Sequence, residues 1–170
     1  MGQYYKPINL DSMTHVYPHD YDNGLKLMEH SWIENDFVEV VENLLAPEGK
    51  WHRCRLVWAG DYADPETDTE ENLFTLSTKK PSPIPKKSKY RYIVNHTKRL
   101  YIDKKALKEE EKGWTIHPLP LLTSEGNGRG GGDYRGTNKN IGTWARDSIS
   151  MELEPPKDYK EMAIIFTEKN

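Results

Sequence analysis

The sequence predicts an α+β fold built on a mostly antiparallel, strongly twisted sheet of seven to eight strands. Two observations support this prediction. Segments rich in β-forming residues recur along the chain with turn residues between them, in the manner of a meander. The two helical patterns both lie early, before residue 50. At 170 residues the chain is expected to form a single domain over residues 1–170, with five Trp, ten Tyr and three Phe to supply its core.

The chain opens with a predicted β-hairpin over residues 3–19. β-Forming side chains lie on both sides of a turn at Asp11 and Ser12. Because proline lacks the N–H group that a strand ladder needs, Pro7 and Pro18 indicate strands that are short or lie at a sheet edge.

Two early helices are expected next. The first covers residues 25–32, where Leu25, Met28 and Trp32 recur with helical spacing. The second begins after Asn35, which is a good N-cap, and carries apolar side chains at i, i+3, i+4, i+7 and i+8. That stripe consists of Phe37, Val40, Val41, Leu44 and Leu45.

Strands and exposed segments alternate in the middle of the chain. Residues 51–60 predict a buried strand, residues 61–71 an acidic solvated loop, and residues 90–102 a second hairpin. Residues 78–89 hold three prolines and five lysines, which predicts an exposed connector within the domain.

The last third of the chain is expected to be mostly extended. Residues 114–122 predict an extended segment, interrupted by Pro118 and Pro120, that leads into a glycine-rich loop. Further strands are predicted over residues 141–153 and 162–166.

A pseudo-two-fold internal repeat is also predicted. A pattern of tyrosine, isoleucine, asparagine and a turn begins at Tyr5 and again at Tyr90. The sequence WAGD, which ends at Asp61, follows the first pattern, and WARD, which ends at Asp147, follows the second at nearly the same spacing. If the two halves are related, Asp61 and Asp147 occupy equivalent positions.

Composition limits the kinds of partner and the cellular location that are expected. A net charge of −3 and a pI of about 6.1 argue against a dedicated nucleic-acid binder, which normally has a basic excess. Residues 79–99 interleave basic and tyrosine side chains, as some single-strand binders do, but a solvated linker is the favoured interpretation. No signal peptide or membrane-spanning stretch is apparent, and the single cysteine, Cys54, excludes an internal disulfide. A cytoplasmic location without membrane contact is expected.

The glycine-rich loop over residues 125–136, EGNGRGGGDYRG, is the first candidate binding element. It is not a P-loop, because no Gly-Lys-Ser/Thr follows it, and it lacks the βαβ context of a dinucleotide fingerprint. Two interpretations stay open. Its N–H groups, with Arg129 and Arg135, could bind a phosphate or carboxylate, or the loop could simply require positive φ angles. The presence of Arg, Asp133 and Tyr134 among the glycines favours a binding role.

Two histidines are candidates for acid–base chemistry. His96 lies at a hairpin turn and His117 precedes the glycine-rich loop, and Asp61, Asp133 or Asp147 could orient either one. No pair of histidines has a metal-ligand spacing, and structural roles are the default interpretation. No catalytic residue, metal site or cofactor is therefore predicted.

Several segments resemble a family of small proteins from bacterial and bacteriophage genomes. These segments are MGQYYKPINLD, GLKLMEHSW, VWAGDYAD, YRYIVNHTK, IHPLPLL, GNGRGGGDYRG and GTWARD. They cover most of the chain except the connector at residues 78–89. The resemblance implies no catalytic residues. A bacteriophage setting implies a protein that acts on a host partner, such as an inhibitor of a defence system.

Two functional hypotheses follow. The favoured one is a non-enzymatic, cytoplasmic binding protein with a protein partner, acting as a phage-encoded modulator or inhibitor of a host defence protein. The alternative is an enzyme or sponge for a nucleotide or another phosphate-bearing small molecule, with the loop arginines as ligands and a histidine as the acid–base group. The candidate binding residues are Asp61, Asn95, His96, His117, Asn127, Arg129, Asp133, Tyr134, Arg135 and Asp147.

Overall fold

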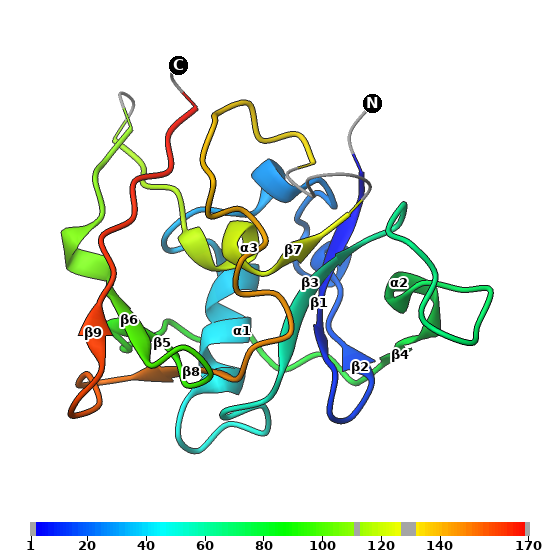
Figure 1. Cartoon of the computed structure of the whole chain (residues 1–170), viewed down its shortest axis with the longest axis horizontal. Helices are drawn as coiled ribbons and strands as arrows, with labels where there is room; N and C mark the ends of the chain where they lie inside the picture. The colour runs from blue at the N-terminus through cyan, green and yellow to red at the C-terminus, as the bar shows by residue number, and fades with distance from the viewer. Residues whose placement is uncertain (1–2, 111–112, 127–131, 169–170) are drawn as a thin grey trace.

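The computed structural model describes residues 3–110, 113–126 and 132–168. Its strands form two separate sheets, with helices α1 and α3 between them (Figure 1). The five-stranded sheet has the order β4-β2-β1-β3-β7, and the four-stranded sheet has the order β8-β5-β6-β9. The strands of the first sheet are β1 (Tyr5–Asn9), β2 (Thr14–His15), β3 (Leu56–Gly60), β4 (Thr78–Lys79) and β7 (Ser124–Glu125). Those of the second sheet are β5 (Tyr92–Asn95), β6 (Leu100–Asp103), β8 (Ile149–Glu152) and β9 (Lys160–Glu161).

The helices are short and few. The α-helices in the described residues are α1 (Asp36–Leu45), α2 (Leu73–Leu76) and α3 (Pro118–Leu122). The 3-10 helices in the same residues are η1 (Pro18–Tyr21), η2 (Leu27–Glu29) and η3 (Lys104–Ala106).

The predicted α+β class is confirmed, but the single sheet of seven to eight strands is wrong. The nine strands found in the described residues divide between two sheets, and both sheets are mixed. Antiparallel pairing joins β1 to β2 and β3, and it joins β5 to β6 and β8. The two-residue strands β4, β7 and β9 then pair in parallel with β2, β3 and β6 respectively.

The two sheets share one arrangement of four strands. In both, a hairpin pairs through its first strand with a later antiparallel strand and through its second strand with a later parallel strand. The first strand of each hairpin ends at an asparagine, Asn9 or Asn95, whose side-chain oxygen accepts N–H groups of the turn. The last residue of each turn, Met13 or Arg99, has a positive φ, of 54° and 57° respectively.

The predicted repeat nevertheless fails at the positions proposed for it. Trp58 lies inside β3 and Asp61 follows that strand, whereas Trp144 and Asp147 both precede β8. Asp61 and Asp147 are therefore not equivalent. The connection from β6 to β8, which includes the glycine-rich segment, does correspond to the connection from β2 to β3, which includes α1.

Helix α1 confirms the second of the two predicted helices. The side chain of Asn35 caps it by accepting the N–H groups of Phe37 and Val38. The helix predicted over residues 25–32 is wrong, because only the short η2 forms there. The carbonyl of Leu25 instead accepts the N–H of Tyr5 at 2.7 Å, and Trp32 forms a bridge with Ile116. Both ends of the segment are thus held by extended backbone.

The last third of the chain is less extended than predicted. Residues 118–122 form α3, because Pro118 fits the first helical position and the His117 side chain accepts the N–H of Leu119. The strand predicted over residues 141–153 shrinks to β8, and no strand forms over residues 162–166.

The main core lies between the two sheets and includes both fully buried tryptophans, Trp58 and Trp144. A second, smaller cluster lies on the other side of β1 and β3, where Leu73 of α2 packs. Burial on both faces explains why β3 reads as an unbroken apolar run. Cys54 is buried and free, as expected for a small hydrophobe, and burial raises the pKa of its thiol to about 12.

Candidate functional site

The candidate residues chosen from the sequence lie in separate parts of the molecule. One group belongs to the end of the four-stranded sheet: Asn95, His96 and Asp147. His117 lies in the core, apart from the other candidate residues. A further group lies around the described ends of the glycine-rich segment: Asp61, Asp133, Tyr134 and Arg135. Asn127 and Arg129 fall outside the described residues.

Asn95 and Asp147 close the turn of the β5–β6 hairpin. The side-chain amide of Asn95 donates to Asp147 Oδ2 at 2.8 Å, and its oxygen accepts the N–H of Lys98 at 2.8 Å. Lys98 Nζ also lies 2.6 Å from Asp147 Oδ2. Asn95 is fully buried, and all of these contacts are internal. The two residues therefore stabilise the hairpin.

His96 belongs to a chain of hydrogen bonds between Tyr159 and His52. Its Nδ1 lies 3.0 Å from Tyr159 Oη, and its Nε2 lies 2.7 Å from Ser150 Oγ. The Ser150 hydroxyl donates to Glu152 Oε2 at 2.6 Å, and the same oxygen lies 2.8 Å from His52 Nε2. Burial lowers the pKa of His96 to about 4, so its ring is neutral at pH 7. Since Ser150 donates to Glu152, we assign the proton of His96 to Nε2, with Nδ1 accepting from Tyr159.

A serine beside a histidine resembles the nucleophile and base of a hydrolase, but Ser150 cannot act as a nucleophile here. The residue has 0% exposure, and its hydroxyl proton is already shared with Glu152. A nucleophile must reach its substrate and pass its proton to the base. The chain therefore ties β8 to the hairpin turn and offers no reactive atom to a ligand.

The partners of His96 were not predicted, and two of them could have been. Ile149 and Met151 are buried in the core, so alternation along the strand directs Ser150 and Glu152 to the other face of β8. Two polar residues on one strand face opposite a turn histidine are a usable signal. His52 and Tyr159 lie outside the strands, where the sequence carries no such periodicity.

His117 is part of a buried charge cluster. Its Nε2 lies 2.6 Å from Glu42 Oε2, and Lys104 Nζ lies 2.8 and 2.9 Å from the two carboxylate oxygens of Glu42. Because the N–H of Leu119 donates to Nδ1 of His117, the neutral ring carries its proton on Nε2 and donates to Glu42.

Burial and pairing act on this cluster in opposite directions. Burial lowers the pKa of His117 more than the nearby Glu42 raises it. For Glu42, burial raises the pKa, but the contacts with His117 and Lys104 outweigh it and leave the pKa below its ordinary value. His117 and Glu42 are each about 1% exposed. The cluster thus joins α1 to α3 in the interior and has no access to a substrate.

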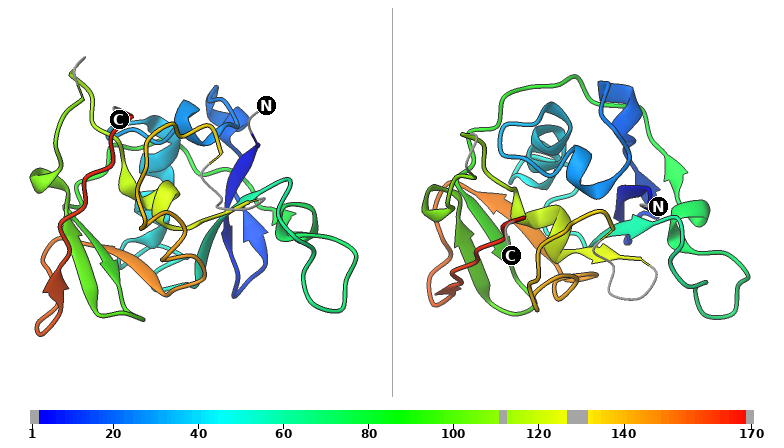
Figure 2. Two further views of the ribbon diagram at one scale, coloured as in Figure 1. Left: turned by 45° about the horizontal axis from the view of Figure 1, so that its top comes forward. Right: turned by 90° about the horizontal axis from the view of Figure 1, so that it is seen from above.

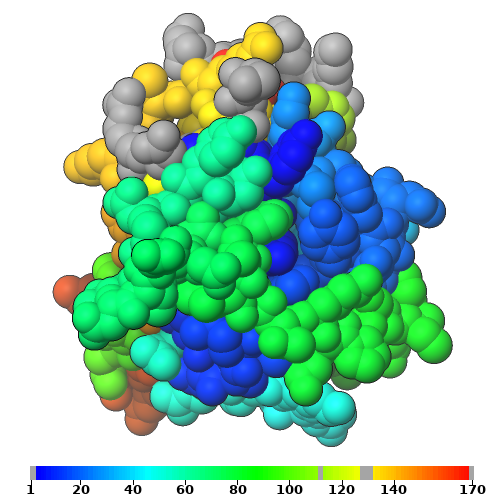
Figure 3. Space-filling view, turned by 90° about the vertical axis from the view of Figure 1, so that its right-hand side faces the viewer, coloured from blue at the N-terminus to red at the C-terminus, as the bar shows by residue number. Residues whose placement is uncertain are grey.

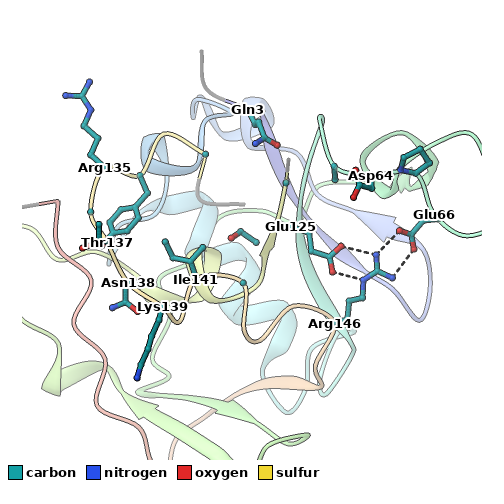
Figure 4. A pocket seen from close by; sticks show the side chains of 18 residues that line it. Gln3, Asp64, Glu66, Glu125, Arg135, Thr137, Asn138, Lys139, Ile141 and Arg146 are labelled. Carbon is teal, nitrogen blue, oxygen red and sulfur yellow. Dashed lines mark hydrogen bonds and ion pairs between the residues drawn. The ribbon is translucent and has the colours of Figure 1, made fainter. Parts of the chain in front are cut away.

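One cavity, with a volume of about 1410 Å³, borders the glycine-rich segment (Figure 4). We call it the first cavity. Most of its lining comes from β7, from the connection that follows β3, and from the segment between residues 132 and 142, and Gln3 and Arg146 also contribute to it. The charged residues of this lining are Asp64, Glu66, Glu125, Arg135, Lys139 and Arg146.

Arg146 forms ion pairs with two carboxylates within the first cavity. Its Nε and Nη2 donate to Glu125 at 2.6 and 2.9 Å, and its Nη1 and Nη2 donate to Glu66 at 2.9 and 2.7 Å (Figure 4). A guanidinium has five N–H groups, and four bonds of this kind leave little capacity for a phosphate. Arg146 therefore joins β7 to the acidic connection after β3.

The described glycines beside the first cavity make room for Tyr5. A Cβ atom at Gly126 would lie 2.5 Å from Tyr5 Oη, and one at Gly132 would lie 2.7 Å from Tyr5 Cε1. Gly132 also has a φ of 57°, in the left-handed region. Packing against a buried tyrosine accounts for these two glycines without a bound phosphate.

Asp133 and Tyr134 anchor the segment that follows these glycines. Asp133 Oδ1 accepts the N–H of Met28 at 2.8 Å, and burial raises the pKa of its carboxyl. The Tyr134 hydroxyl donates to the carbonyl of Thr167 at 2.8 Å. Both side chains therefore make structural contacts, although Tyr134 also lines the first cavity.

Asp61 and Arg135 lie at the borders of this region. Asp61 Oδ1 accepts the N–H of Tyr4 at 2.9 Å, which fastens the start of β1 to the end of β3. Arg135 lies across the first cavity from Arg146, and its guanidinium points outward (Figure 4). The two arginines do not converge on one anion.

Within residues 3–110, 113–126 and 132–168, no cluster of three or more His, Cys, Asp or Glu side chains could hold a metal ion. Over the same part of the chain, no helix combines the length and apolar character needed to cross a membrane.

Comparison of the chain with protein-family models, with curated proteins and with solved structures gave no match.

Proposed function

We propose that this protein is a non-enzymatic binding protein that receives a segment of a partner protein in the first cavity. One observation carries the proposal. The polar residues suited to acid–base chemistry are dispersed and bonded internally, whereas exposed polar groups from three distant parts of the chain surround one large cavity. Its volume of about 1410 Å³ exceeds the roughly 300–1,000 Å³ of typical small-ligand sites.

The charge of the first cavity favours a protein segment over a nucleotide. Three cationic and three anionic side chains line it: Arg135, Lys139, Arg146, Asp64, Glu66 and Glu125. A polyphosphate site normally concentrates positive charge and backbone N–H groups on one anion. A balanced set of charges suits the polar rim of a protein interface.

The resemblance to a bacterial and bacteriophage family directs the choice of partner. We propose that the partner is a cytoplasmic protein of a bacterial host and that binding modulates or inhibits it, as an inhibitor of a defence system would. Nucleic acid is a poor alternative, given the net charge of −3.

The proposal is tested by cross-linking from inside the cavity. The photoreactive residue p-benzoylphenylalanine is placed at Thr137, an exposed position in the cavity lining, and at Lys157, an exposed control outside it. A host protein captured from position 137 and not from position 157 is then purified. Its affinity is measured by calorimetry for the unmodified chain, for Thr137→Trp and for Lys157→Trp.

The expected result is a loss of at least about tenfold in affinity for Thr137→Trp, and none for Lys157→Trp. Equal affinity of the two variants overturns the proposal, as does the absence of any position-specific cross-link. A thermal-shift series with nucleotides runs in parallel. Stabilisation by a nucleotide that Thr137→Trp abolishes would contradict a protein partner and support the phosphate-ligand alternative.

A further inference from the structure

Residues 80–88 form a strap across the surface, fastened near both ends. Near its start the Ser82 hydroxyl donates to Asp20 Oδ2 at 2.6 Å. Near its end the Asn43 amide donates to the carbonyl of Lys86 at 2.9 Å. The strap arches from β4 around α1 to β5, and it lies on the surface beside the N-terminal residues drawn in blue (Figures 2 and 3).

A second cavity, of about 940 Å³, lies between the strap and the body of the protein. One side of it is formed by apolar residues from α1, the turn after it and the residue after β2: Val40, Leu44, Ala46, Trp51 and Val16. The strap contributes three more, Pro81, Pro83 and Ile84. The volume falls within the range of small-molecule sites, and the lining resembles the mainly apolar walls of such sites.

The charged groups of the second cavity are predominantly positive. Its lining includes Lys50, Lys80 and Lys86 against a single acid, Glu48. Within the part of the chain that the structure describes, none of these three lysines forms an ion pair. The neighbouring Lys79, by contrast, is paired with Asp20. Three lysines against one acid give the cavity lining a net positive charge.

Apolar walls and a net positive charge together favour one class of ligand. Apolar surface favours a ligand with apolar atoms to bury, and the lysines favour an anion. Because the strap is held near both ends, the space beneath it suits a small molecule better than a folded partner. We propose that the second cavity binds a small organic anion with an apolar body, whose carboxylate pairs with the lysines of the strap. This inference rests on observations separate from those at the first cavity.

Dodecanoate is the probe for this site, with dodecanol and dodecylammonium as its neutral and cationic counterparts. Binding to the full chain is measured by calorimetry below the concentration at which each amphiphile forms micelles. We expect saturable binding of one dodecanoate per chain, at least about tenfold tighter than that of dodecylammonium. Since the contribution of the lysines is electrostatic, added salt should weaken it.

Matched double variants locate the site. Lys80→Gln with Lys86→Gln removes two charges from the cavity, and Lys105→Gln with Lys108→Gln removes two from an exposed region outside it. All four side chains are exposed, so both variants should fold. The first pair should weaken dodecanoate binding about tenfold or more, and the second should leave it unchanged.

Three outcomes overturn the inference: no saturable dodecanoate binding, equal binding of dodecylammonium, or wild-type affinity in the variant of Lys80 and Lys86. Thr137→Trp, which places a bulky side chain in the lining of the first cavity, should bind dodecanoate like the unmodified chain. A loss of binding in that variant would place the anion in the first cavity and would also contradict the inference.

Discussion

Lowering the pH should weaken the fold, and part of that loss should come from one buried imidazole, that of His30. This ring has 0% exposure and makes two hydrogen bonds. Its Nδ1 lies 3.0 Å from the carbonyl of Gly24, and its Nε2 accepts the indole N–H of Trp58 at 2.9 Å. A carbonyl can only accept, so the neutral ring carries its proton on Nδ1. A second proton, on Nε2, would face the indole donor and break that bond.

The size and sign of the effect follow from the pKa of His30. Burial lowers it from 6.5 to about 4, against an opposing contribution from the hydrogen bond to Gly24. The unfolded chain therefore takes up this proton at higher pH than the folded chain does. Stability from His30 is present above pH 6.5 and is lost as the pH falls toward 4. Between pH 7 and pH 5 the loss amounts to about 2 kcal/mol.

Urea unfolding at a series of pH values, followed by tryptophan fluorescence, measures this loss. His30→Gln is the matched variant, because an amide offers one donor and one acceptor and does not titrate in this range. All other groups titrate alike in both proteins, so the difference between the two pH profiles reports His30. Parallel profiles would refute the reasoning. If His30→Gln does not fold, an NMR titration of the ring in the unmodified chain decides instead, and a pKa near 6.5 contradicts it.

Two further predictions concern buried contacts. Glu42→Gln should cost about 3 kcal/mol, because Lys104 loses its buried counter-ion, and should lower Tm by roughly 6–12 °C. Glu39→Gln, a half-buried position on the same helix, should cost less than about 1 kcal/mol, and similar losses in the two variants would contradict the argument. Gly132→Ala should cost about 1–3 kcal/mol in urea unfolding, because a Cβ would meet Tyr5 Cε1 at 2.7 Å and φ is 57°. A neutral effect would show that Tyr5 can move aside.

Local patterns predicted the parts of the fold that local interactions determine. The N-cap at Asn35 and the apolar stripe that follows it identified α1, and turn residues identified both hairpins. The division into two sheets could not be predicted in this way. β4 and β9 each pair over only two residues, with strands that are far away in the sequence. α3 was missed because its start depends on a side-chain contact of His117, although the proline at its first position was a readable signal.

For the candidate site too, local patterns were predictable and long-range contacts were not. The residue types were chosen by chemistry, but their roles depend on partners that lie far apart in the sequence. His117 meets Glu42 across 75 positions, and His96 meets Ser150 across 54. Glu42 follows a stripe residue on α1, and an amphipathic pattern gives no reason to bury a carboxylate there. Only the fold shows that these polar groups satisfy one another.

The arrangement that the two sheets share shows which features the hairpin turn itself requires. Leu10, just after β1, and His96, just after β5, make the same backbone bond. Each N–H donates to the residue before the strand opposite, Arg55 before β3 and Ser148 before β8. A leucine serves this turn as well as a histidine, so the turn itself does not require an imidazole.

Both cavities, in contrast, take their charged lining residues mainly from connections between the shared strands. The first is lined by segments after β3 and between β7 and β8, and the second lies under the strap between β4 and β5. Loops on a rigid scaffold are where binding residues concentrate. Substitutions within the shared strands should therefore act mainly on the free energy of unfolding. Substitutions in these connections should act mainly on affinity, which is why Thr137, Lys80 and Lys86 are the informative positions.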